Sequence, residues 1–176
     1  MKKLSLTLLM AVAVVGSAFA GTEAKSFKEK VVVEPTCRFR ANELQVDAFA
    51  AGLWYNGGRP AWGGGLGVNY FFTQHIGIGV EQDVVGRNNE RAEWATIGNL
   101  FLRYPICSLN LAPYAVVGGG GSYGSGRSGH GFGHVGGGLE YRVTDNIGLF
   151  SDARWVYSSQ DPRSGLIGRA GLRFAF

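Results

Sequence analysis

Long apolar runs are missing from this 176-residue chain beyond its first 20 residues. No later stretch holds the 18 or more consecutive apolar residues that a transmembrane helix needs. The mean hydropathy of +0.03 is also too low for a bundle of membrane helices. Only helices and closed barrels satisfy their backbone hydrogen bonds in lipid, so this chain can enter a membrane only as a β-barrel.

Lysine is absent beyond Lys30, and every fixed positive charge after that residue is an arginine. Nucleic-acid-binding proteins rarely exclude lysine so completely, so we expect no nucleic acid partner. Arginine is the residue preferred for bidentate ion pairs in confined surroundings. The pattern therefore favours ion pairing over a basic binding surface.

Cysteine and histidine are too few and too scattered to predict a metal site. The two cysteines and three histidines show no ligand spacing, so we expect neither a metal nor a cofactor. Glycine is abundant, with 29 residues, but it follows no Gly-X-Y period and aromatic residues make up 12% of the chain. Collagen and plain disorder are therefore excluded.

The chain begins with two lysines, an apolar stretch at residues 4–15 and the motif Ala18-Phe19-Ala20. This pattern predicts a secretory signal peptide over residues 1–20. Its removal takes away two lysines and no acids, which leaves 15 basic and 13 acidic side chains and a net charge of +2. The polar residues 21–43 are interpreted as a short periplasmic extension, followed by one domain at residues 44–176.

From residue 44 onward, short alternating segments are separated by turn residues, without helical periodicity. Eight segments of 11 to 13 residues have the length of tilted membrane-spanning strands, and bacterial barrels require an even number. In the last segment Leu166 and Leu172 share one face, and Arg169 and Arg173 share the other. The pattern predicts an all-β fold, an eight-stranded antiparallel up-and-down transmembrane β-barrel. The predicted strands cover residues 44–55, 60–72, 75–85, 92–104, 111–121, 132–143, 147–157 and 166–176.

Aromatic residues fall into two predicted belts. All four tryptophans lie near the outer ends of the predicted strands. At a rise of about 3.3 Å per residue, the belts stand roughly 20 to 25 Å apart along the membrane normal, the height of a barrel's apolar band. The alternative is a soluble β-sandwich with these aromatics in its core. The inner belt is expected to contain Tyr70, Phe72, Tyr104, Tyr114, Tyr141, Phe174 and Phe176.

Three motifs give the chain a family resemblance. They are Gly138-Leu139-Glu140-Tyr141-Arg142, Asp152-Ala153-Arg154 and the closing Leu172-Arg173-Phe174-Ala175-Phe176. With these motifs residues 44–176 resemble the OmpA-like and OmpX-like family of small outer-membrane barrels. The resemblance implies that Phe174 and Phe176 are presented to the barrel assembly machinery. It also implies a monomer in outer-membrane lipid, here without a peptidoglycan-binding domain after Phe176.

Charged residues on the inward faces of the predicted strands are expected to pair, because isolated burial of a charge costs several kcal/mol. An eight-stranded barrel is just wide enough for side chains to fill it. The pattern therefore predicts a salt-bridge network that closes the lumen. The alternative is a narrow pore with a selectivity filter, favoured by inward glycines at Gly63, Gly65, Gly67, Gly136 and Gly138. The predicted network contains Asp47, Glu81, Asp83, Glu93, Arg103, Glu140, Arg142, Asp152, Arg154, Arg169 and Arg173.

Both cysteines lie at the predicted inner side, Cys37 before the first strand and Cys107 in a turn. Because an oxidising periplasm favours disulfides, we predict that they pair and draw residues 31–43 across the periplasmic mouth. Closing a loop of about 70 residues constrains the unfolded chain by about 4 kcal/mol in the loop-entropy model. Two free thiols are the alternative.

Small barrels can also be lipid A-modifying enzymes, and the candidate catalytic group here is Ser128, His130, His134 and Glu140. A serine hydrolase needs its nucleophile, base and acid within hydrogen-bond reach. Ser128 and His130 are placed in an outer loop, whereas Glu140 lies far down a strand. The sequence therefore favours no catalytic residues.

The predicted function is a non-catalytic outer-membrane barrel with a structural or surface-interaction role in the cell envelope. Outer connections are predicted at residues 56–59, 86–91, 122–131 and 158–165. Their arginines are placed to meet lipopolysaccharide phosphates, with solvated surface charge as the alternative. These arginines are Arg59, Arg87, Arg91 and Arg127.

Overall fold

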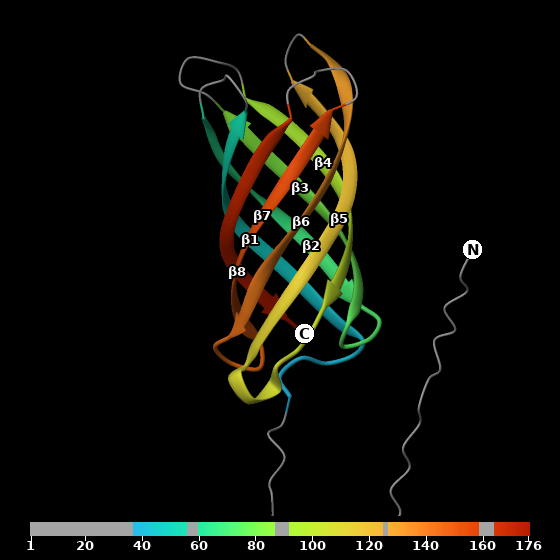
Figure 1. Cartoon of the computed structure of the whole chain (residues 1–176), viewed down its shortest axis with the longest axis vertical. Helices are drawn as coiled ribbons and strands as arrows, with labels where there is room; N and C mark the ends of the chain where they lie inside the picture. Colours follow the sequence, from blue (N-terminus) through green and yellow to red (C-terminus); the bar gives the residue numbers. More distant parts are fainter. Residues whose placement is uncertain (1–36, 56–59, 87–91, 125–126, 159–163) are drawn as a thin grey trace, which may run out of the picture. The chain divides into compact units, whose positions relative to one another are not determined.

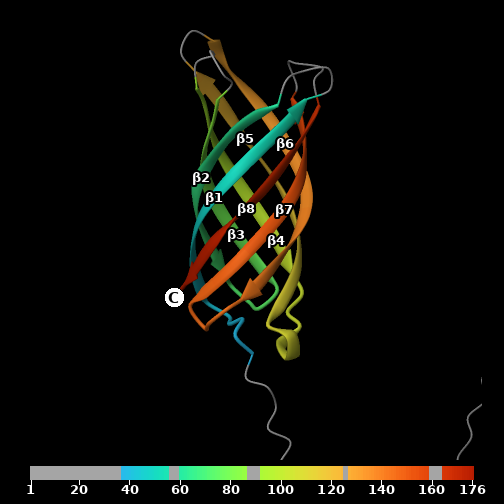
Figure 2. The same cartoon turned by 90° about the vertical axis from the view of Figure 1, so that its left-hand side faces the viewer.

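The computed structural model describes residues 37–55, 60–86, 92–124, 127–158 and 164–176. Within them, eight antiparallel strands form a closed barrel in which each strand pairs with its neighbours in the chain and β8 pairs with β1 (Figures 1 and 2). The predicted signal peptide and residues 21–36 of the extension lie outside the described residues. The elements are β1 (Glu43–Tyr55), β2 (Ala61–Phe71), β3 (Ile76–Gly86), β4 (Glu93–Arg103), the 3-10 helix η1 (Cys107–Leu109), β5 (Leu111–Gly124), β6 (Arg127–Arg142), β7 (Ile147–Ser158) and β8 (Gly165–Ala175).

The barrel closes where β1 meets β8. Their register runs from Gln45 opposite Ala175 to Tyr55 opposite Gly165. Beyond the strand, the amide of Phe176 donates to the carbonyl of Leu44 at 2.9 Å, and the amide of Leu44 donates back at 3.3 Å. Closure leaves no unpaired strand edge, which is the condition for a sheet in lipid.

Short turns gather at one end of the barrel, which we call the turn end; the opposite end is the loop end. The turns at residues 72–75, 104–110 and 143–146 lie at the turn end, together with residues 37–42 (Figure 1). No helix among the described residues is long and apolar enough to cross a membrane.

Alternation along the strands places apolar side chains outside and charged side chains inside. In β8, Leu166 and Leu172 are exposed at 41% and 44%, whereas Arg169 and Arg173 are exposed at 3% and 1%. Trp54, Trp62 and Trp94 also face outward, and the rings of Trp54 and Trp62 meet edge to face. The predicted eight-stranded antiparallel barrel, with apolar side chains on its outer surface, is confirmed.

Two parts of the expected strand pattern were wrong. The region 122–131 was expected to be a loop, but β5 extends to Gly124 and β6 begins at Arg127, because glycine-rich backbone still forms the ladder, with a register irregularity near Ser122. Tyr114 was placed in the lipid-facing belt, but it is 6% exposed and points inward with Ala112 and Val116. The aromatic character of Tyr114 therefore did not show which face of β5 points outward.

Candidate functional site: the ion-paired lumen and its latched mouth

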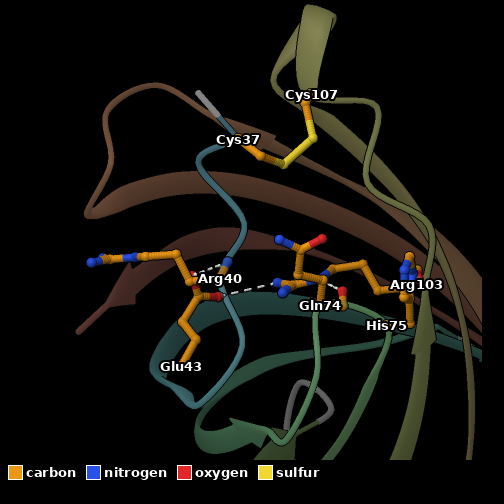
Figure 3. Close-up of a disulfide and its surroundings, with 7 residues drawn as sticks. All are labelled: Cys37, Arg40, Glu43, Gln74, His75, Arg103 and Cys107. Atoms are coloured by element: carbon orange, nitrogen blue, oxygen red, sulfur yellow. Dashed lines mark hydrogen bonds and ion pairs between the residues drawn. A yellow bond between two sulfur atoms is a disulfide. The ribbon is translucent and has the colours of Figure 1, made fainter. Parts of the chain in front are cut away.

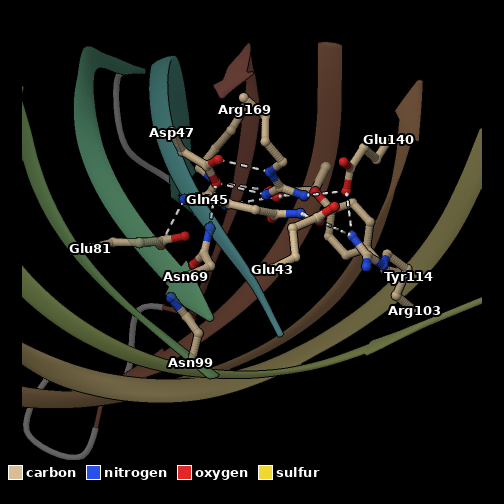
Figure 4. Close-up of polar contacts among 12 residues, drawn as sticks. Glu43, Gln45, Asp47, Asn69, Glu81, Asn99, Arg103, Tyr114, Glu140 and Arg169 are labelled. Atoms are coloured by element: carbon tan, nitrogen blue, oxygen red, sulfur yellow. Dashed lines mark hydrogen bonds and ion pairs between the residues drawn. The ribbon is translucent and has the colours of Figure 1, made fainter. Parts of the chain in front are cut away.

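Ten charged side chains meet inside the barrel and form two groups. Figure 4 shows some of them, among them Asp47, Arg103 and Arg169. Each comes from an inward position of a strand, where alternation gives it no route to solvent. The turn-end cluster contains Glu43, Asp47, Arg103, Glu140, Arg142 and Arg173. The central cluster contains Glu81, Asp152, Arg154 and Arg169.

In the turn-end cluster, Arg173 joins two acids from opposite parts of the wall. Its guanidinium donates to both carboxylate oxygens of Asp47 at 2.7 Å and to Glu140 at 2.7 Å. Arg142 bridges Glu140 at 2.5 Å and Glu43 at 2.6 Å. Arg103 lies 3.2 Å from Glu43 and 3.6 Å from Glu140. The cluster therefore connects β1, β4, β6 and β8 across the lumen.

In the central cluster, two arginines share two acids. Arg169 contacts Asp152 at 2.7 and 2.9 Å and Glu81 at 2.7 Å. Arg154 donates to the two oxygens of Glu81 at 3.0 and 3.1 Å. The Tyr114 hydroxyl donates to Asp152 at 2.8 Å. This tyrosine, which was expected to face lipid, therefore belongs to the polar interior.

Charge in the two clusters is matched, with three acids against three arginines in one and two against two in the other. Several guanidinium groups also lie over aromatic rings, including Arg103 at 3.9 Å from the Phe71 ring centroid and Arg169 at 4.4 Å from that of Phe49. Removing one partner from such a buried pair leaves a charge uncompensated, which costs about 3–5 kcal/mol. The network therefore holds opposite sides of the barrel wall together, and separating its ion pairs to open the lumen would cost considerable free energy.

The structure brings together all but two of the charged residues that the sequence placed in this network. Glu93 is half-buried at the loop end, and Asp83 is buried at 4% exposure, but neither makes an ion pair within the described part of the chain. Glu43 was missed because the expected strand began one residue later. The two-residue spacing of Glu43, Gln45 and Asp47 was the signal that could have found it.

The turn-end mouth is covered by the segment before β1. Cys37 forms a disulfide with Cys107 of η1, with Cα atoms 4.7 Å apart (Figure 3). Arg38 donates to the carbonyl oxygens of Arg142 and Val143 at 2.9 and 2.8 Å. The segment thus spans the mouth from η1 to the end of β6, as its residues 37–43 were expected to do.

The side chain of Phe39, in the middle of this segment, has no exposed surface. Its ring centroid is 4.9 Å from the Arg103 guanidinium carbon and 5.2 Å from that of Arg142. Asn42 then reverses the chain in the left-handed region at φ 55°, a conformation that asparagine tolerates better than most residues. The covering segment therefore packs, through the Phe39 ring, on two arginines of the turn-end cluster.

The inward glycines lie where the wall leaves no room for a side chain. A Cβ on Gly63 would collide with the carbonyl of Val84, and a Cβ on Gly65 would lie 2.6 Å from the carbonyl oxygen of Gln82. These glycines permit close approach of neighbouring strands and curvature of the wall. Comparable backbone contacts would arise at Gly136 and Gly138, whereas a Cβ on Gly67 would meet only the side chain of Glu81 at 3.0 Å.

The residues weighed as a catalytic group are not assembled into one. Glu140 is bonded to Arg142 and Arg173. His130 pairs in register with Ser122, ten residues from Glu140 along β6, or about 33 Å at the usual strand rise. His134 is buried in the lumen. No three His, Cys, Asp or Glu side chains of the described residues are grouped to hold a metal ion.

Several predicted residues have no described side chain. Arg59, Arg87 and Arg91 lie outside the described residues, and the side chains of Arg127 and Ser128 are likewise not described. Phe174 lies near the end of β8, and Phe176 follows the strand and is exposed at 67%. Their role in assembly stays a prediction.

No protein-family model and no curated protein matches the chain. Among solved structures, the N-terminal β-barrel domain of Pseudomonas aeruginosa OprF matches with a TM-score of 0.62 and 19% identity, covering 78% of this chain and 99% of that chain. Neisserial surface protein A matches with a TM-score of 0.62 and 15% identity, covering 76% and 96%. P. aeruginosa OprG matches with a TM-score of 0.54 and 10% identity, covering 80% and 99%.

Identities this low show the fold alone. The matches nevertheless agree with the closed eight-stranded barrel described above. The chain therefore has the fold of the small eight-stranded outer-membrane β-barrels, consistent with its resemblance to the OmpA-like and OmpX-like family.

Proposed function

We propose that this protein is a non-catalytic structural barrel of the bacterial outer membrane whose lumen is closed. One observation carries the proposal: ten charged side chains from six strands meet across the lumen in matched ion pairs. A conducting path would have to pass between groups held at 2.5 to 3.6 Å from one another. Ion pairs this close leave no space for a solute to pass between their two members.

The covering segment supports closure at the turn end, which would face the periplasm. The disulfide holds Cys37 to η1, and Arg38 forms an ion pair with Asp145 of the β6–β7 turn at 3.2 Å. The Phe39 side chain of this segment is fully buried. Lifting the segment would therefore expose an aromatic ring to water as well as break these bonds. Both ends of the segment would have to be released before the mouth could open.

The membrane role rests on the outer surface of the barrel. Outward residues such as Leu66, Val80 and Leu102 are exposed at 60% or more, which suits contact with acyl chains. The partners that follow are outer-membrane lipid, lipopolysaccharide at the loop end and the assembly machinery during biogenesis. We propose a monomer.

Planar-bilayer recording tests the closed state. The purified full chain, refolded with its disulfide, is expected to show no stable conductance steps. The double variant Cys37→Ser/Cys107→Ser, and separately Phe39→Ala, are expected to show brief openings at most, because the ion pairs remain. Stable open steps of the unaltered protein would overturn the closed lumen and favour the narrow pore.

A narrow pore is the second candidate, and the inward glycines are the feature that suggested it. The close contacts at Gly63 and Gly65 explain those glycines by the curvature of the wall instead. Lipid A modification is a more distant alternative. It would be revealed by a mass shift of lipid A in cells that overproduce the protein, and we expect none.

A further inference from the structure

His134 is a buried side chain that the ion-pair network does not use. It points inward from β6 and is 4% exposed, and neither of its ring nitrogens has a hydrogen-bond partner among the described residues. No acid of the described lumen forms an ion pair with it, and an unpaired buried group stays neutral. A neutral imidazole has one N–H group and one lone pair, so two hydrogen bonds are missing here.

Asn99 of β4 also has a polar atom without a partner. Its Oδ1 atom accepts a hydrogen bond from Arg154 at 3.2 Å, which fixes the orientation of the amide and makes Nδ2 the free donor. Asn99 is 6% exposed, and although it lies near Glu81, Nδ2 forms no hydrogen bond there. Figure 4 shows this side chain projecting into the lumen. The amide therefore offers its N–H groups to a further acceptor.

Gly118 of β5 brings these two side chains together. It pairs in register with Asn99 on one side and with His134 on the other. A Cβ built on this glycine would lie 2.7 Å from His134 Nε2 and 2.8 Å from Asn99 Oδ1. The ring nitrogen and the amide oxygen are therefore no farther apart than the sum of these distances. One molecule that forms two hydrogen bonds of ordinary length can bridge the ring and the amide.

The chemistry of the unpartnered atoms decides what can bind between them. A cation would use only the lone pair of the ring and would be repelled by the amide N–H groups and by Arg154. An anion would use only N–H groups and would lie near Glu81 and Asp152, which act on Asn99 and His134. A water molecule is neutral, donates and accepts, and so satisfies both kinds of atom. The lining therefore fits water and not an ion.

We propose that an ordered water molecule is bound between His134 and Asn99. It accepts a hydrogen bond from Asn99 Nδ2 and donates one to His134 Nε2, so the ring carries its proton on Nδ1. The Nδ1–H group, which also lacks a protein partner, donates to a second water. This link joins β4 to β6 across Gly118 of β5. Water held in this way belongs to the barrel interior, and its binding does not depend on whether the lumen is closed.

A crystal structure of the full chain, at a resolution that shows ordered solvent, tests the site directly. We expect a water peak within hydrogen-bond distance of both His134 Nε2 and Asn99 Nδ2. His134→Phe keeps a flat ring without nitrogen atoms and is expected to lose this water. The control is His75→Phe at the exposed turn between β2 and β3, which should keep it. A dry site, an ion at this position or an unchanged water in His134→Phe would overturn the proposal.

NMR of the ¹⁵N-histidine-labelled protein in detergent micelles tests the same site in solution. The signals that disappear in His134→Phe belong to His134. Its Nε2 is expected to have the shift of an unprotonated nitrogen that accepts a hydrogen bond, and its ring protons should show cross-relaxation with long-lived water. The exposed His75 should contact only short-lived water. A proton on Nε2, or no water contact at His134, would refute the site, whereas conductance in bilayers would refute only the closed lumen.

Discussion

The two ends of the lumen differ in how their charges are balanced. At the turn end, each arginine of the cluster lies within 3.6 Å of two acids. These arginines are Arg103, Arg142 and Arg173, and a disulfide-anchored segment covers them. Towards the loop end, apolar side chains such as Leu53 and Ile167 pack on one side, and Asp83 makes no ion pair among the described residues. The same barrel wall thus supports a covered end with paired charges and an end with an unpaired acid.

This difference teaches that closure of the barrel and neutrality of its interior are separate properties. Strand pairing alone closes the wall, because every backbone group finds a neighbouring strand. Neutrality depends on which side chains the alternation happens to bring inward. At the turn end, Glu43 pairs with Arg103 and Arg142, so that acids and arginines are equal in number. Towards the loop end, no arginine of the described residues forms an ion pair with Asp83.

The largest effect is expected from breaking the turn-end cluster. Arg173→Met removes the guanidinium that joins Asp47 to Glu140 and leaves both acids without their shared partner, so the free energy of unfolding should fall by about 3–5 kcal/mol. Urea unfolding in lipid vesicles, followed by tryptophan fluorescence, measures the loss. The control is Arg40→Met, an exposed arginine of the covering segment, which should change stability little. Equal losses in both variants would contradict a special role for the cluster.

The disulfide should come next. Cys37→Ser/Cys107→Ser removes a cross-link between residues 70 positions apart and is expected to lower stability by up to about 4 kcal/mol in the loop-entropy model. The comparison is made by unfolding with and without reductant. Reductant should destabilise the unaltered protein and leave the double variant unchanged. Mass spectrometry of non-reduced digests provides a direct check, and free thiols at both positions would show that the segment is not anchored.

A smaller effect is expected from the hydrogen bond between Tyr114 and the central cluster. Tyr114→Phe keeps the ring and removes the hydroxyl that donates to Asp152, so stability should fall by about 1.5 kcal/mol. The control is Tyr70→Phe, which removes an exposed hydroxyl bonded to Asn42 and should cost less. If the Tyr114 variant were as stable as the unaltered protein, the inward phase assigned to β5 would be in question.

The smallest effect sharpens the contrast between the two ends. Asp83→Asn replaces a buried carboxyl whose Oδ1 has no hydrogen-bond partner, so it should leave stability unchanged or raise it by about 1 kcal/mol. Asp152→Asn removes an acid bonded to Arg154, Arg169 and Tyr114 and should be clearly destabilising. A loss with Asp83→Asn equal to that with Asp152→Asn would mean that Asp83 has a favourable partner after all.

The sequence was a good guide wherever the period of two is visible in side-chain type. Leu166 and Arg169 differ so much in polarity that the faces of β8 follow directly, and the eight-stranded barrel follows from such segments in series. It was a poor guide in the glycine-rich part of β5 and β6, because glycine has no side chain to show a period. That is why residues 127–131 were expected to be a loop and Tyr114 was assigned to the wrong face.

Within the site, polarity and alternation determined by themselves which charges face the lumen. They did not determine partners, because a partner depends on where two strands far apart in the chain meet across the barrel. Arg142 lies 99 residues from Glu43, and only closure of the sheet brings them to 2.6 Å. The same closure left Asp83 without an ion pair among the described residues, since strand register and not the neighbours in sequence decides which arginines it can reach.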